Sequence, residues 1–193
     1  MNTGHVLKSI RGIVEMILRA LCLMLCMALV ACAFVAYHDI LDVEGFYDTF
    51  GGEYEDSGLY TSGAIALVVM GALGMTLEIT MMIIRLLNPK WHHRYFLYFG
   101  ITDIVLTVLL MLCLFAGGVA NAKYANDNDN FLDERRSFCD DNPEQDYTCD
   151  DIETVRNYEA ISAALSLFSI IPFGVLIAVM IVTIMASRKP EVD

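Results

Sequence analysis

Four long apolar runs within 193 residues constrain this chain more than any other feature of its sequence. They cover residues 12–37, 61–87, 95–122 and 157–187. Each run reaches the ~20 residues that a helix needs to cross the ~30 Å hydrocarbon core of a bilayer. Because these runs contain most of the apolar residues, little remains to form a soluble core. We therefore predict an all-α membrane protein, a single domain over residues 1–193 built as a four-transmembrane-helix bundle.

The placement of charge predicts how this bundle is oriented. Lysine and arginine gather before the first run, in the segment 85–94 and after the fourth run, whereas residues 38–60 and 123–156 are strongly acidic. Lysine and arginine are enriched in the cytoplasmic loops of membrane proteins. We therefore expect both termini in the cytoplasm, two acidic extracellular loops over 38–60 and 123–156, and a multi-pass protein of the plasma membrane.

The predicted cytoplasmic segments are too short for a soluble catalytic domain, which needs at least ~50 residues. The sequence also shows no pairing of a nucleophile with a base and no metal-ligand constellation. We therefore expect a protein that is not an enzyme and that uses no cofactor and no metal. The expected partners are membrane lipids, other membrane proteins and a second copy of the chain, with no nucleic acid.

Charged side chains inside the apolar runs are the first candidate site. Counting 1.5 Å per residue from the inner ends of the runs places Arg19, Glu78 and Asp103 at a similar depth, ~10–15 Å into the same leaflet. Glu15 stands four residues before Arg19, on the same helix face. An unpaired charge at such a depth costs ~2.5–3.5 kcal/mol on insertion scales, so we expect an ion-pair layer.

This layer has two interpretations from the sequence. It is either an ion-pair clasp between the first and third spans, or part of a path for a cation or proton. The sequence leaves open which of the three acids pairs with Arg19. A path would need further polar residues toward the outer side, and the first three runs offer few of them.

The outer segments contain two further candidate sites. Phe46, Tyr47, Phe50 and Tyr54 alternate with carboxylates in the first acidic segment, a composition that favours a partner-docking surface. In the second acidic segment, alternating aspartates over 127–133 offer carboxylates for calcium, although the glycine and distal glutamate of an EF-hand are missing. A solvated acidic loop is the alternative that we favour there.

Cysteines divide between the outer segment and the membrane. Cys139 and Cys149 lie ten residues apart in the second acidic segment, and an extracellular compartment favours a disulfide between them. The other four cysteines lie within the apolar runs. Of these, Cys22 and Cys26 have three residues between them, which differs from a C-x-x-C redox pair, and we expect all four to stay reduced.

Small residues recur at helical spacing in the third and fourth runs. Close approach of helix backbones drives association in lipid, because lipid tails give no hydrophobic force between helices. The stripes therefore serve either internal packing or contact with a neighbouring protomer. They are Ala116 with Ala120, Gly118 with Ala122, Ala160 with Ala164, and Ser162 with Ser166 and Ser169.

Three short motifs resemble MARVEL-type four-span proteins, including fungal membrane organisers and Casparian-strip or junction-like relatives. They are the arginine in Met-Ile-Leu-Arg-Ala over 16–20, the aspartate in Phe-Gly-Ile-Thr-Asp-Ile over 99–104, and Phe-Ala-Gly-Gly-Val-Ala-Asn-Ala-Lys over 115–123. The resemblance implies a membrane-apposition, junction or microdomain protein without catalysis.

These observations lead to two functional hypotheses of different classes. The first is a non-enzymatic plasma-membrane scaffold that organises membrane domains or cell–cell junctions by lateral and outer-loop association. The second is a small transporter, channel or channel subunit that uses the layer formed by Arg19, Asp103 and Glu78.

Overall fold

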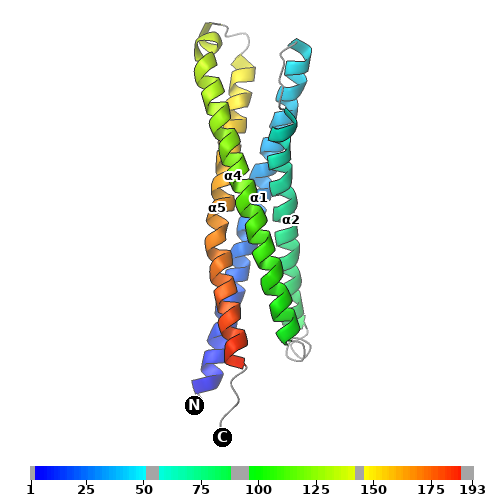
Figure 1. Cartoon of the computed structure of the whole chain (residues 1–193), viewed down its shortest axis with the longest axis vertical. Helices are drawn as coiled ribbons and strands as arrows, with labels where there is room; N and C mark the ends of the chain where they lie inside the picture. Colours follow the sequence, from blue (N-terminus) through cyan, green and yellow to red (C-terminus); the bar gives the residue numbers. More distant parts are fainter. Residues whose placement is uncertain (1–2, 51–56, 88–95, 142–145, 188–193) are drawn as a thin grey trace.

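A computed structural model describes the chain except for residues 1–2, 51–56, 88–95, 142–145 and 188–193 (Figure 1). Side chains are described over 10–38, 63–87, 97–126 and 153–186. All the secondary structure in this described part is helical. The helices are α1 (Thr3–Phe50), α2 (Ser57–Leu87), α4 (Phe96–Asp141) and α5 (Asp146–Ser187).

Each helix contains one stretch that is long and apolar enough to cross a membrane, which confirms the predicted all-helical chain with four candidate spans. Large apolar side chains are exposed along the outer faces of all four stretches, as expected for surfaces that contact lipid. The stretches are Ile10–His38, Gly63–Leu87, Leu97–Asn126 and Glu153–Ala186.

The helices extend well beyond these spans, and here the prediction of loops over 38–60 and 123–156 was too broad. Helix α1 continues to Phe50, α4 continues to Asp141, and α5 already begins at Asp146. The physical reason is visible in the sequence, because residues 123–141 contain neither glycine nor proline to end the helix. A high content of acidic residues does not by itself stop a helix.

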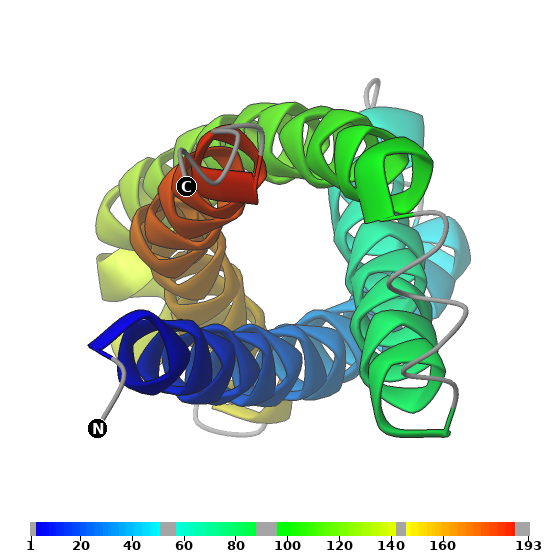
Figure 2. The same ribbon diagram turned by 90° about the horizontal axis from the view of Figure 1, so that it is seen from below.

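The four helices run alternately up and down and form a closed ring of neighbours (Figures 1 and 2). Around this ring, α1 packs beside α2, α2 beside α4, α4 beside α5, and α5 beside α1. Helix α1 begins and α5 ends at the same end of the bundle. In the described part of the chain, the backbones of the diagonal pair α1 and α4 do not approach each other closely.

A seam of buried positions runs along each helix with alternating steps of three and four residues. This average spacing of 3.5 is that of left-handed coiled-coil packing, in which one stripe of each helix faces the bundle axis. On α1 the buried positions are Glu15, Arg19, Cys22, Cys26, Leu29, Ala33 and Ala36. On α5 they are Val155, Glu159, Ser162, Ser166, Ser169, Phe173, Leu176 and Met180.

Glycines on α2 allow α1 to approach closely. A Cβ atom at Gly71 would lie 2.6 Å from Cγ2 of Val30 and 3.4 Å from the carbonyl oxygen of Cys26. At Gly74 it would lie 2.8 Å from Sγ of Cys26. A larger residue at either site would displace the side chain of Val30 or Cys26, so the two glycines allow the close approach of α1 and α2.

We expect Gly71→Ala to destabilise the protein by about 1–3 kcal/mol, because the stiff Val30 side chain must move to admit the added methyl group. The measurement is the melting temperature of the purified protein in detergent. Gly174→Ala is the matched control, because nothing lies within 4 Å of its Cβ position, and it should keep or raise stability. An equal effect of the two substitutions would contradict close packing at Gly71.

Candidate functional site

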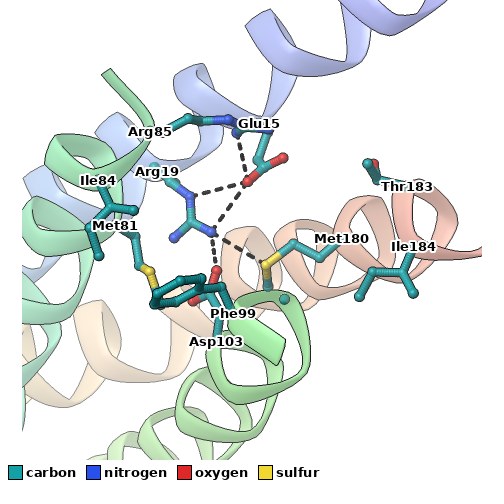
Figure 3. Close-up of a pocket in the computed structure, with 11 residues that line it drawn as sticks. Glu15, Arg19, Met81, Ile84, Arg85, Phe99, Asp103, Met180, Thr183 and Ile184 are labelled. Atoms are coloured by element: carbon teal, nitrogen blue, oxygen red, sulfur yellow. Dashed lines mark hydrogen bonds and ion pairs between the residues drawn. The ribbon is translucent and has the colours of Figure 1, made fainter. Parts of the chain in front are cut away.

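Arg19 of α1 is 2% exposed, and its guanidinium contacts groups from all four helices. Figure 3 shows its contacts with Glu15, Asp103 and Met180. Nη1 donates to Oε2 of Glu78 on α2 at 3.0 Å. Nη2 donates to Asp103 of α4 and contacts Sδ of Met180 on α5 at 3.3 Å. Nη2 and Nε also contact Oε1 of Glu15, one turn earlier on α1, at 3.3 and 3.4 Å. The guanidinium therefore occupies the point where the four seams meet.

The structure thus brings together the four charged residues that the sequence singled out, Glu15, Arg19, Glu78 and Asp103. All three acids contact Arg19, so the question of which one pairs with it has no single answer. Thr107, one turn along α4, donates from Oγ1 to Oδ1 of Asp103 at 3.5 Å. We call Glu15, Arg19, Glu78 and Asp103, together with Arg85, the charge layer.

Arg85 is a member of the charge layer that the sequence analysis missed. Its Nη1 lies 2.7 Å from Oε1 of Glu15, an ion pair that joins α2 to α1, although the geometry is not that of a hydrogen bond. The sequence analysis counted Arg85 only among the positive charges that orient the chain. The available signal was its spacing, because it follows Glu78 by seven residues and therefore returns to the same seam.

A small pocket adjoins the charge layer (Figure 3). Its volume is about 30 Å³, which is room for one or two water molecules. Glu15, Arg19, Arg85, Asp103 and Thr183 supply its polar lining, and Phe99 is part of its apolar wall. The pocket lies toward the end of the bundle where α1 begins and α5 ends.

The core beyond the charge layer is apolar. The buried side chains at the next levels of the seams are mainly Leu29, Leu110, Leu114, Phe173 and Leu176. Along α5, the seven helical steps from Ser169 to Leu176 span ~10 Å. The described side chains therefore place a hydrocarbon plug of about that length between the charge layer and the next polar level.

A second polar level lies at the opposite end of the bundle. Nδ2 of Asn121 on α4 donates to Oγ of Ser162 on α5 at 2.9 Å, and Ser162 donates to the carbonyl oxygen of Glu159 at 2.9 Å. Glu159 is 1% exposed. A Cβ atom at Gly63 would lie 2.5 Å from Oδ1 of Asn121, so only glycine fits there on α2.

Glu159 is therefore a fifth buried charged residue of the spans, in addition to the four that the sequence singled out. It was not predicted from the sequence. It lies only two residues inside the predicted start of the fourth span, where an acid is unremarkable. The missed signal was again the seam: Glu159 continues the stripe of Ser162, Ser166 and Ser169 at steps of three, four and three. The structure buries this whole stripe inside the bundle.

The remaining predicted site residues lie where side chains are not described. Phe46, Tyr47 and Phe50 fall on the helical backbone of α1, and Tyr54 lies outside the described residues. The aspartates over 127–133 fall on the backbone of α4. Docking through the aromatics and calcium binding by the aspartates both stay predictions.

The cysteines within the spans are free thiols: Cys22, Cys26, Cys32 and Cys113. Cys139 falls on the backbone of α4 and Cys149 on that of α5, with side chains outside the described set, so their disulfide stays a prediction. Among the side chains that are described, no three His, Cys, Asp or Glu residues form a group that could hold a metal ion.

No protein-family model, curated protein or solved structure matches this chain. The class that the fold and the site define is a four-helix membrane protein with a buried charge layer. Its function must be argued from its own residues.

We expect Asp103→Asn to cost about 3–5 kcal/mol, because it removes a carboxylate from a buried guanidinium. The measurement is thermal unfolding of the solubilised protein, with exposed Thr102→Val on the same helix as control. The double variant Arg19→Leu with Asp103→Leu should recover part of the loss, because apolar replacement of both partners can be neutral. A melting temperature unchanged by Asp103→Asn would show that the layer does not hold the bundle together.

Proposed function

We propose that this chain is a non-enzymatic plasma-membrane scaffold, which associates laterally and organises membrane domains or cell–cell junctions. Both termini lie in the cytoplasm and the acidic helical extensions lie outside. The positive-inside distribution of lysine and arginine supports this orientation. The resemblance to MARVEL-type proteins supports the same function.

The use of the buried polar groups favours a structural role over conduction. The guanidinium of Arg19 contacts four side chains. The hydroxyl of Ser166 donates to the carbonyl oxygen of Leu114 at 2.6 Å. The hydrocarbon plug separates the two polar levels. A conducted ion or proton would have to cross about 10 Å of core, made mainly of leucine and phenylalanine side chains with the thiols of Cys22 and Cys26, in which the described residues offer no carboxyl, amide or hydroxyl group.

Lateral association is supported by where the small residues lie, because some pack inside the bundle and others are exposed on its outer face. Gly118 packs inside the bundle, where its Cβ position lies 3.1 Å from Cβ of Ser166. Ala160 and Ala164, one turn apart on α5, are exposed on the outer face. A helix face with alanines at this spacing lets a second backbone approach closely, which is the geometry that drives association in lipid.

The outer extensions give this scaffold a second surface. Phe46 and Phe50 stand four residues apart on the helical backbone of α1, beyond its candidate span. We assign docking of a partner outside the membrane to this segment, because aromatics set among charges provide contact area at low entropic cost. The partner's surface there should be basic or neutral, since two acidic surfaces repel each other.

Association through the alanine face predicts the effect of enlarging it. Ala160→Leu with Ala164→Leu should raise the dissociation constant of the oligomer in bilayers at least tenfold, or about 1.4 kcal/mol, while the chain still folds. The measurement is the fraction of paired chains by single-molecule photobleaching at graded protein-to-lipid ratios. Ala66→Leu, at an exposed alanine of α2, the helix diagonally opposite α5, is the matched control. Unchanged pairing in the double variant would exclude this face.

A further inference from the structure

The charge layer contains one more acid than base. Its carboxyl groups belong to Glu15, Glu78 and Asp103, and its guanidiniums belong to Arg19 and Arg85. If every group were ionised, the layer would carry a net charge of −1 among apolar side chains. An uncompensated charge inside a membrane bundle is strongly unfavourable, so a positive charge must balance it.

Glu78 is the acid that is least supported as an anion. Glu15 contacts both guanidiniums, and Asp103 contacts Arg19 and accepts a hydrogen bond from Thr107. Glu78 is 0% exposed and contacts Arg19 through Oε2 alone. Its second oxygen, Oε1, is fully buried and has no hydrogen-bond partner among the described residues.

The surroundings of Glu78 fit a proton better than a metal cation. Arg19 and the thiols of Cys22 and Cys26 lie near it on α1, and Asp103 lies near it on α4. The side chain that α5 contributes to the layer is Met180, which does not titrate. A metal cation needs several oxygen ligands. Glu78 offers only one oxygen without a hydrogen-bond partner among the described residues, Oε1. Glu78 does not line the adjoining pocket, where Glu15 and Asp103 lie beside the guanidiniums that pair with them.

We propose that Glu78 is a proton-binding site, which holds one proton on Oε1 and makes the buried charge layer electrically neutral. Glu78 then acts as a neutral side chain that still accepts the hydrogen bond from Nη1 of Arg19. The two positive charges of Arg19 and Arg85 are balanced by Asp103 and Glu15. This inference does not depend on the proposed scaffold function.

The proposal separates two substitutions that otherwise look equivalent. Glu78→Gln replaces a neutral acid with a neutral amide of the same shape, so the layer stays balanced. Asp103→Asn removes one of the two required negative charges, so the layer then stays neutral only if Glu78 releases its proton and ionises, although its Oε1 has no hydrogen-bond partner among the described residues. If Glu78 were ionised, each substitution would remove the same surplus charge, and the two variants would behave alike.

The test is infrared spectroscopy of the full chain in lipid at neutral pH. A protonated carboxylic acid has a carbonyl stretching band that ionised carboxylates lack, and the band shifts in heavy water. We expect this band in the parent protein and its loss in Glu78→Gln. Glu159→Gln is the control for the other buried acid, and it should leave the Glu78 band in place. Glu78→Asp, which keeps the acid, should shift the band and serves if Glu78→Gln does not accumulate.

Absence of the band from the parent protein would overturn the proposal, as would a band that persists unchanged in Glu78→Gln and Glu78→Asp. Thermal unfolding gives a second readout. Glu78→Gln should melt within a few degrees of the parent and Asp103→Asn well below it, since the first substitution keeps a neutral side chain at its position and the second removes a required negative charge. Equal losses in the two variants would also overturn it.

Discussion

The arrangement of this bundle depends on the guanidinium of Arg19 and on what an apolar interior demands of a charge. A buried cation must be surrounded by partners, and the planar guanidinium donates in several directions at once. Its partners Glu78, Asp103 and Met180 each come from a different helix. Through this one side chain, α1 is joined to α4, the helix diagonally opposite, which its own backbone does not reach. Since buried ion pairs often add little net stability, we attribute to the layer a role in specificity: it determines which faces of four apolar helices meet, and at which register.

The rest of the seam follows from that register. Once the charge layer is aligned, Gly71 and Gly74 fall where α1 approaches, and Gly118 falls opposite Ser166. Lipid provides no hydrophobic force to push helices together, so these close approaches supply the dispersion contacts instead. Small residues with no neighbour inside the bundle, such as Ala160 and Ala164, remain on its outer face. The same physical rule therefore connects internal packing with the proposed association between chains.

The sequence predicted the helical class and the four spans because length and apolarity alone decide whether a segment can cross a bilayer. It also singled out Arg19 and Asp103, since charges in such runs are conspicuous. It failed where a charge stands near the end of a run. Arg85 and Glu159 could be assigned to the membrane boundary, and only the spacing along the seam shows that they face inward. The helical extensions of α4 and α5 were missed for another reason: the whole segment between two apolar runs was taken as a loop, although no glycine or proline interrupts residues 123–141.

The central question is whether the buried charges hold the bundle together or serve a moving ion. The hydrocarbon plug formed by Leu110, Leu114, Phe173 and Leu176 lies between the charge layer and the polar level of Asn121. Flux of protons and monovalent ions across vesicles that contain only this chain, under an imposed membrane potential, tests this most directly. We expect the flux to equal that of protein-free vesicles. Flux that increases with the amount of protein, and that Glu78→Gln or Glu159→Gln removes, would contradict a purely structural charge layer and favour a transporter or channel.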